Sequence, residues 1–205
     1  AALEKSDMHP EDKIIEVLPW HHIYQYATQY IALATGQELS VSTALDMQKS
    51  KLKILEEIAP DHMTAVPLVW EKISKQVNDN IVLKEKAASG IKKFVLEGAQ
   101  KALRLDSAKA VMQDLERNKG TDFEPQSIEY WKPQMEVAGE TLGEFKGVIN
   151  KIQMQIGRSL GYPKIKKQMG LDNMHYVVNG GGTLSPGTAA WYQALGVDMK
   201  IGYGM

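Results

Sequence analysis

The sequence predicts an α/β protein with a mostly parallel sheet flanked by helices and a helical insertion within it. Short β-rich runs alternate with amphipathic stretches over roughly the first 80 residues, and the same rhythm returns after residue 174. Strand signals are missing from residues 80–160, where the helical period is sustained. Because strands that alternate with helices form parallel sheets, we expect a single partial domain over residues 1–205 with an insertion over residues 80–160.

The composition is that of an ordinary globular protein. The chain has 205 residues, 43% of them hydrophobic and 24% charged, with a formal net charge of −1. The absence of cysteine excludes a disulfide framework, a thiolate zinc site and a cysteine nucleophile, and fits a reducing compartment. No apolar run approaches the ~20 residues of a membrane-spanning helix, and the near-zero charge disfavours a nucleic-acid partner. We therefore expect a cytoplasmic protein.

The first elements follow the β-α-β pattern. Residues 13–18 form a β-rich run that Pro19 ends, which predicts a buried strand. An amphipathic helix is expected over residues 22–34 because apolar side chains recur every three or four residues, and Gly36 is a suitable C-terminal cap. The apolar positions of this helix are Ile23, Tyr26, Ala27, Tyr30, Ile31 and Ala34.

Two further strands precede the insertion. Residues 39–42 alternate as a strand does, and residues 47–58 have a helical period that Pro60 stops. Residues 62–66 form another strand before Pro67, and a helix begins at Val69.

The insertion is predicted to be helical and basic. Its apolar side chains keep helical spacing in two stretches, Ile91, Phe94, Val95, Ala99, Ala102 and Leu103, then Leu142, Phe145, Val148, Ile149, Ile152 and Ile156. From Lys84 to Lys109 there are seven basic and three acidic residues, a net charge of +4. Such a run is more typical of a solvated helix face, and peripheral contact with a membrane surface stays open.

The C-terminal part contains the best-marked helix. A strand over residues 174–179 leads into a Gly-rich turn, after which Ser185 is a candidate cap, Pro186 suits the first helical position and Gly196 the end. A last strand over residues 197–201 leads into Gly202-Tyr203-Gly204-Met205.

The two Gly-rich turns are candidates for ligand binding, because open parallel sheets bind ligands beyond the carboxyl ends of their strands. At Gly180, Gly181 and Gly182 the lack of a Cβ lets a planar ligand reach the backbone, although a purely structural turn fits the same residues. Tyr203, between two glycines, is placed to stack on a purine or to pack in the core. Neither turn has the spacing of a dinucleotide fingerprint or a P-loop.

The histidines and carboxylates give weaker signals. The adjacent His21 and His22 do not have metal-ligand spacing, and His22 beside Trp20 fits either a cleft wall or local hydrogen bonding. No Ser-His-Asp order and no spaced carboxylate pair favours hydrolase chemistry.

Four motifs, taken in order, resemble the long-chain fatty acyl-CoA synthetases of the adenylate-forming superfamily. They are Leu18-Pro19-x-x-His22, residues 63–73 (MTAVPLVWEKI), Gly180-Gly181-x-x-Leu184-Ser185-Pro186, and Gly202-Tyr203-Gly204-Met205. Long-chain members also carry a helical insertion between the second and third motifs. Acyl–acyl-carrier-protein synthetases share the pattern and are the alternative assignment.

The resemblance implies a ligase of fatty acid metabolism. ATP and a long-chain fatty acid would give an acyl-adenylate and pyrophosphate, with Mg²⁺ accompanying the ATP, and the thiol of coenzyme A would then displace AMP. By resemblance, the nucleotide-binding residues are Gly180, Gly181, Gly182, Thr183, Gly202, Tyr203, Gly204 and Met205, with Tyr203 stacking on the adenine. His22 would border the acyl and carboxylate site, and we take Trp20, Tyr24 and Tyr26 as candidate walls of an acyl tunnel.

The chain departs from the family pattern at its ends. The phosphate loop with its lysine, the Thr-Glu after Met205, the ribose-binding aspartate and the C-terminal domain all fall outside it. We therefore expect a central fragment of the N-terminal domain, with no catalytic residue or Mg²⁺ ligand of its own and no activity alone. Within the chain, Leu68 replaces an arginine, and Gly182-Thr183 replaces Ala-Pro. A non-catalytic module that keeps an adenine slot, and a purely structural domain, are the alternatives.

Overall fold

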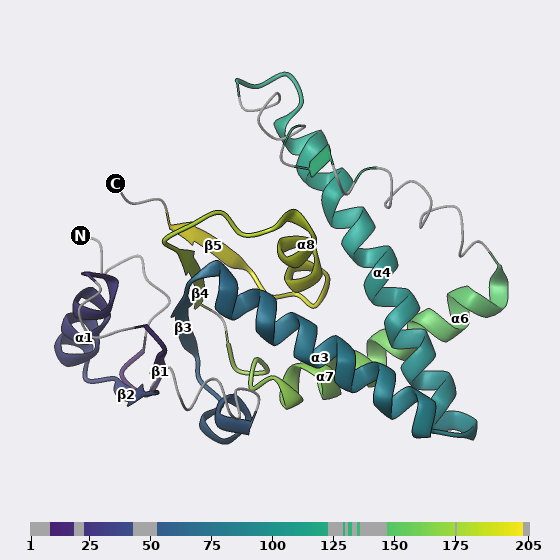
Figure 1. Ribbon diagram of the computed structural model, residues 1–205, viewed down its shortest axis with the longest axis horizontal. Helices are drawn as coiled ribbons and strands as arrows, with labels where there is room; N and C mark the ends of the chain where they lie inside the picture. The colour runs from purple at the N-terminus through teal and green to yellow at the C-terminus, as the bar shows by residue number, and fades with distance from the viewer. Residues whose placement is uncertain are drawn as a thin grey trace. The chain divides into compact units, whose positions relative to one another are not determined.

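The computed structural model describes residues 9–18, 23–42, 53–122, 129, 131–132, 135, 147–174 and 176–202 (Figure 1). For Tyr24, Ile201 and Gly202 it describes the backbone only. The chain divides into two compact units, each built from separate segments. Unit 1 comprises Ala1–Ile73, Lys166–Thr183 and Val197–Met205, and unit 2 comprises Ser74–Ile165 and Leu184–Gly196.

Unit 1 contains a parallel sheet in the order β2-β1-β3-β4-β5. The strands are β1 (Lys13–Glu16), β2 (Glu38–Val41), β3 (His62–Ala65), β4 (Tyr176–Gly180) and β5 (Met199–Gly202). Every pairing within the described part of the sheet is parallel, so the carboxyl ends of the strands share one edge. The predicted α/β class and parallel sheet are confirmed.

The helices predicted at residues 22–34, after Pro67 and after Ser185 are present, whereas the helix at residues 162–168 is not predicted by the sequence pattern. Leu142 and Phe145 of the predicted insertion lie outside the described residues. The described helices are α1 (Ile23–Thr35), a turn of helix over residues 53–58, α3 (Pro67–Ala87), α4 (Gly90–Asn118), α6 (Val148–Ile156), α7 (Tyr162–Gln168) and α8 (Pro186–Ala194). A π-helical turn, η2 (Gly157–Gly161), joins α6 to α7. Residues 47–52 of the predicted second helix lie outside the described residues.

One row of the sheet forms the centre of the unit 1 core. Ile15, Met63 and Val177 are neighbours in the strand register, and each is at most 1% exposed. Trp70, in the first turns of α3, is fully buried, and its indole N–H donates to the carbonyl of Ala65 at 3.2 Å. Burial of these apolar side chains is the main force that holds the strands together.

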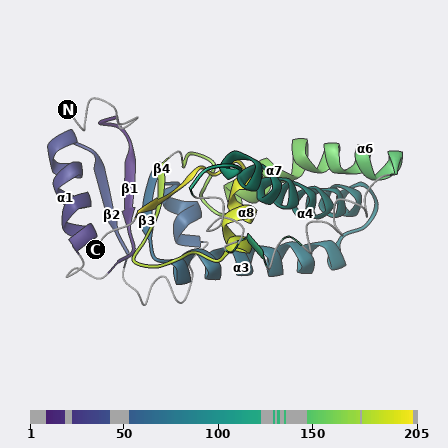
Figure 2. The ribbon, with the colours of Figure 1, turned by 90° about the horizontal axis from the view of Figure 1, so that it is seen from above.

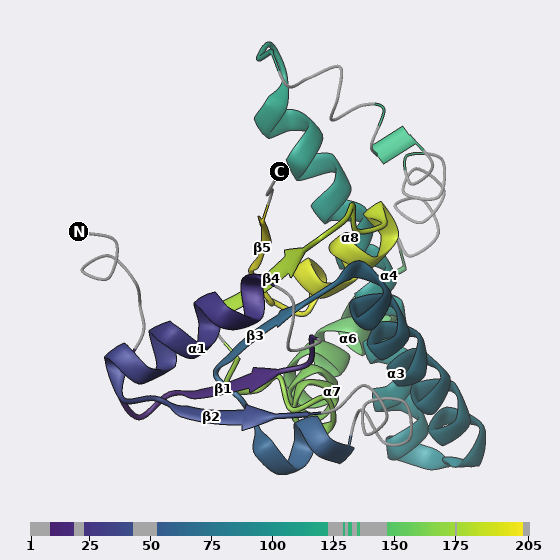
Figure 3. The ribbon, with the colours of Figure 1, turned by 60° about the vertical axis from the view of Figure 1, so that its left-hand side comes forward.

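Helix α1 lies across β1 and β2 but turns its apolar side chains outward (Figure 3). The exposed fractions of Ile23, Tyr30 and Leu33 are 76%, 71% and 80%, whereas Gln25 is only 2% exposed. The predicted amphipathic helix is therefore present, but its larger apolar side chains face away from the sheet. The cause is Glu16 on the underlying strand, whose buried carboxylate is bonded by glutamines of α1.

In unit 2, α4 crosses the end of α6 and the start of η2 at a contact made by glycines. A Cβ placed on Gly157 would lie 2.2 Å from backbone atoms of Gly98 and Ala99, and one on Gly98 would lie 2.1 Å from the carbonyl oxygen of Gln153. Only residues without side chains allow the two backbones to approach this closely. Beyond the crossing, Arg158 binds Asp106 through two hydrogen bonds of 2.7 Å, which raises the pKa of its guanidinium.

Helix α8 has the caps that its sequence predicts. The hydroxyl of Ser185 accepts from the N–H of Thr188 at 3.4 Å, Pro186 occupies the first turn, and Gly196 ends the helix with a φ of +73°. Trp191 anchors α8 within unit 2, because its indole N–H donates to the side-chain oxygen of Asn78 at 3.1 Å.

Across the described part of the chain, none of the helices combines the length and the apolar character needed to cross a membrane.

Candidate functional site at the carboxyl edge of the sheet

The predicted glycine turn lies at the carboxyl edge of the sheet. Strand β4 ends at Gly180, and Gly181, Gly182 and Thr183 follow it as exposed residues. Gly180 is the register partner of Gly202 on β5, so the structure brings the starts of the two predicted Gly-rich segments side by side. This is the edge at which open parallel sheets bind their ligands.

The turn rests on a buried support. Asn179 is fully buried, and its amide donates to the carbonyl of Gly182 at 3.0 Å. Gly181 has a φ of +75°, a conformation that favours glycine. A Cβ on Gly181 would approach Val66 to 3.4 Å, and one on Gly182 would approach Pro67 to 3.3 Å. The turn is thus held close to the end of β3, while its backbone stays open to solvent.

A buried carboxyl group ends β1 at the same edge of the sheet. Glu16 is 3% exposed, and it accepts hydrogen bonds from the side-chain amides of Gln25 and of Gln29, the latter at 3.2 Å. Its second oxygen has no hydrogen-bond partner among the described residues. Burial raises the pKa of Glu16, although both amide hydrogen bonds act in the opposite direction. Glu16 therefore holds its proton at a higher pH than an exposed glutamate does.

Sequence reasoning missed this cluster. The signal was the single acidic residue inside the apolar run of residues 13–18, followed by glutamines four residues apart in the next helix. An acidic residue inside a buried strand requires partners, and the adjacent helix supplies them.

A second buried polar cluster lies at the opposite, amino edge of the sheet. Asp12 accepts from His62 Nε2 at 2.7 Å and from the backbone N–H of His9 at 2.6 Å, and both side chains of the Asp12–His62 pair are at least nine-tenths buried. This Asp12–His62 cluster lies where β1 and β3 begin, at the edge opposite to the one where parallel sheets bind ligands.

The remaining candidate residues are only partly placed. Tyr26 is 49% exposed on α1. The other candidates lie outside the described residues, or, for Tyr24, have only their backbone described: Trp20, His22, Tyr24, Tyr203, Gly204 and Met205. The described side chains include no group of three or more His, Asp or Glu residues that could hold a metal ion.

A comparison with known proteins identifies the family of the chain. The family model of the AMP-binding enzymes matches residues 1–205. The chain therefore belongs to the AMP-binding enzyme family.

Among curated proteins, the chain is similar to the chloroplastic long-chain-fatty-acid–[acyl-carrier-protein] ligase of Arabidopsis thaliana. The two are 25% identical over 198 residues, which cover 95% of this chain and 24% of the relative. The chain thus spans about a quarter of the length of that protein. No solved structure matches it significantly.

Proposed function

We propose that this chain is part of a ligase that activates a long-chain fatty acid with ATP and passes the acyl group to a thiol. The observation that carries the proposal is the exposed glycine turn at the carboxyl edge of the sheet, in a chain of the AMP-binding family. The resemblance to long-chain acyl-CoA synthetases makes coenzyme A one candidate acceptor, and the name of the Arabidopsis relative makes an acyl carrier protein the other.

In this proposal the chain binds and orients its substrates. The backbone of residues 180–183 reads the edge of the adenine, Tyr203 stacks on its face, and Gly202, Gly204 and Met205 shape the pocket. His22 borders the fatty-acid carboxylate, while Trp20, Tyr24 and Tyr26 contribute to the acyl site; the exposure of Tyr26 makes it the weakest member. The fatty-acid carboxylate displaces pyrophosphate at the α-phosphate, so positioning and electrostatics supply most of the catalysis.

The proposal is tested by fatty-acid-dependent exchange of labelled pyrophosphate into ATP. The protein to assay is the full-length product of the gene that contains this sequence, because the chain spans only a quarter of its relative. Exchange would support the proposal, and subsequent assays with coenzyme A and with acyl carrier protein would identify the acceptor. Nucleotide binding without exchange by the folded protein would favour a non-catalytic adenine-binding module instead.

A pair of glycine variants tests the role of the turn. Gly181 and Gly36 share a φ of +75°, so alanine strains both backbones equally, and a Cβ on Gly36 would meet nothing within 4 Å. We expect G181A to raise the apparent Kd for ATP by roughly tenfold, with G36A close to wild type. Equal affinities in the two variants would contradict a nucleotide site at this turn.

A further inference from the structure

Glu16 places a buried carboxyl group of unit 1 at the edge of the sheet where parallel sheets bind ligands. It is the last residue of β1, and His22, which we propose to border the fatty-acid carboxylate, is six residues further along the chain. Helix α1 begins directly after His22 and lies beside β1 and β2 (Figure 2). Glu16 therefore lies between the strand and the helix that flank the predicted acyl-site residues.

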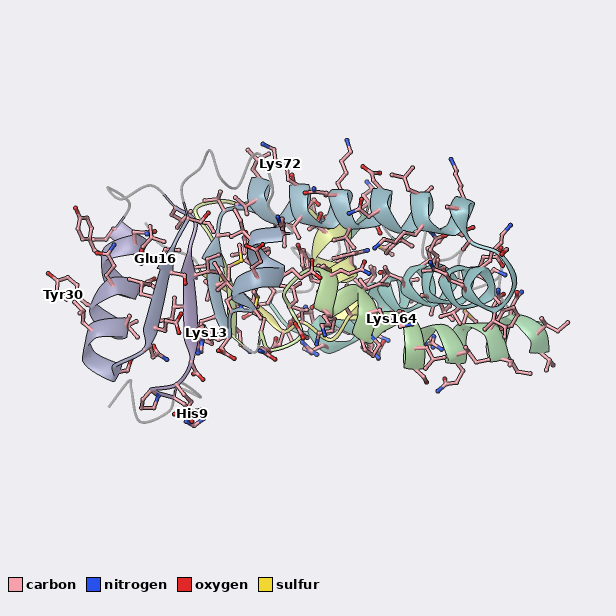
Figure 4. The ribbon with its side chains drawn as sticks, turned by 90° about the horizontal axis from the view of Figure 1, so that it is seen from below. His9, Lys13, Glu16, Tyr30, Lys72 and Lys164 are labelled. Atoms are coloured by element: carbon pink, nitrogen blue, oxygen red, sulfur yellow. The ribbon has the colours of Figure 1, made fainter. Side chains whose placement is uncertain are left out.

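The two oxygens of the Glu16 carboxyl group differ in their bonding. The side-chain amides of Gln25 and Gln29 both donate to Oε2 from α1, which packs over Glu16 (Figure 4). Oε1 is buried and has no hydrogen-bond partner among the described residues. A carboxyl oxygen accepts up to two hydrogen bonds, and burying it without one is costly. Oε1 therefore requires a partner that the described part of the chain does not supply.

The surroundings of the carboxyl group are polar and fixed. Glu16 and Gln25 are 3% and 2% exposed, so the amide bonds hold the carboxyl group in one orientation. The register partner of Glu16 on β3 is Thr64, which is partly buried. Since register partners on neighbouring parallel strands point to the same face of a sheet, the last rows of β1 and β3 combine a carboxyl group and a hydroxyl group on one face.

A hydroxyl group suits Oε1 better than an ammonium group does. Burial raises the pKa of Glu16 and so disfavours the ionised form that a cation needs. A hydroxyl group can donate to an ionised carboxylate and can accept from a protonated one, so it fits Glu16 in either state. A plain hydrocarbon chain offers neither bond and would leave Oε1 unpaired.

We propose that Glu16 is a specificity-determining residue that selects a hydroxylated long-chain fatty acid, with the hydroxyl group of the substrate bonded to Oε1. This inference rests on the proposed ligase function and adds to it the class of acyl substrate. A site that hydrogen-bonds a substrate hydroxyl group rejects the analogue without it, because the analogue leaves a buried polar group unpaired. Gln25 and Gln29 are positioning residues, because their bonds to Oε2 fix the direction of Oε1.

The test is a competition between acids in the full-length protein. The protein receives ATP and an equimolar mixture of hexadecanoic acid with its 2-hydroxy, 3-hydroxy or 16-hydroxy derivative, and hydroxylamine traps the acyl-adenylates as hydroxamates. Mass spectrometry of the two hydroxamates gives the ratio of the kcat/KM values, whatever the amount of active protein. We expect one of the hydroxy acids to be favoured over hexadecanoic acid by at least about tenfold.

Variants of Glu16 separate specificity from stability. E16M should bring the ratio to within about twofold of one, because a thioether is only a weak acceptor. The conservative variant E16Q keeps a polar group and should retain a preference of roughly threefold or more. If E16M does not fold, Q29M reports on the same bond, since it loosens the carboxyl group and should lower the ratio about threefold. The control is E38M, because Glu38 is exposed on β2 and its substitution should leave the ratio unchanged.

The outcomes distinguish this inference from the ligase function on which it rests. Use of hexadecanoic acid in preference to every hydroxy acid would overturn the inference alone, and would mean that Oε1 binds water only. A ratio in E16M equal to that of the wild type would overturn it as well. No hydroxamate from any of these acids, with the protein folded, would overturn the proposed ligase function and this inference together.

Discussion

At the scale of single residues, the two edges of the sheet carry polar clusters of different kinds. Glu16, at the carboxyl edge, is a buried carboxyl group whose second oxygen has no hydrogen-bond partner among the described residues. Asp12, at the amino edge, is bonded by a histidine ring and by the backbone. Because the pKa of Glu16 is raised, its ionised form destabilises the folded state at neutral pH. The hydrogen bonds of the Asp12 cluster stabilise the folded state.

The pH dependence of stability should reveal Glu16. Since its pKa in the folded state lies above the ordinary value of 4.5, the native state binds more protons, and its stability falls as the pH rises through that window. We expect the free energy of unfolding of E16Q, relative to wild type, to be higher at pH 8 than at pH 4, as measured by urea denaturation. The exposed Glu38 supplies the control variant E38Q. A difference that stays constant between the two pH values would contradict the prediction.

Substitution of Asp12 should destabilise the fold without changing the affinity for ATP. D12A removes the acceptor of the buried His62 Nε2 and of the His9 N–H, at a cost of about 2–5 kcal/mol. Thermal unfolding should show the loss, and ATP affinity measured below the transition should stay within about twofold of wild type. A selective loss of nucleotide affinity would instead place Asp12 in the functional site.

At the scale of elements, the sequence predicts where helices occur better than which side they bury. The spacing of apolar residues gives the period of α1 and α6, but the buried sides of both contain glutamine. In α1 the determinant is Glu16 on a strand, and in α6 it is a set of bonds to a helix about 50 residues away. Neither determinant is visible in the helix's own sequence, because satisfying buried polar groups depends on tertiary partners.

The crossing of α4 and η2 should depend on Gly157. In G157A the new Cβ would lie 2.2 Å from the backbone of the neighbouring helix, so we expect destabilisation of about 3 kcal/mol. The control is G147A, whose Cβ would approach only Asn150, at 3.8 Å, and should change stability by less than about 1 kcal/mol. Differential scanning calorimetry compares the two. Equal transition temperatures would show that the helices separate easily at this point.

At the scale of the whole molecule, both units are assembled from segments that are distant in the sequence. The position of the glycine turn at the carboxyl edge of the sheet could be predicted. Alternating strands and helices form a parallel sheet, and in a parallel sheet the turns that follow the strands all lie at the carboxyl edge. The division into two units could not be predicted from the sequence. It depends on the packing of α8 against α4, which lies about 80 residues earlier in the chain. The contact joins Ala190 of α8 to a cluster of Ala110, Val111 and Trp131.

A substitution tests the contribution of α8. A190D places a carboxylate in the apolar cluster of Ala110, Val111 and Trp131, so amide hydrogen exchange at Ala110 and Val111 should accelerate by roughly tenfold or more. Ala99 and Ala102, which lie at the α6 crossing, provide the internal control and should change less. Unchanged protection at Ala110 would show that α4 is held without α8.

The π-helical turn between α6 and α7 also bears on how this region tolerates changes in length. A π turn spaces its hydrogen bonds one residue wider than an α-helix does, so deleting one residue there would leave a continuous α-helix. The same deletion within α6 or α7 would rotate the rest of the helix beyond it by about 100° and change which side chains face α4. In an alignment of relatives, single-residue gaps in this helical segment should therefore cluster at residues 157–161.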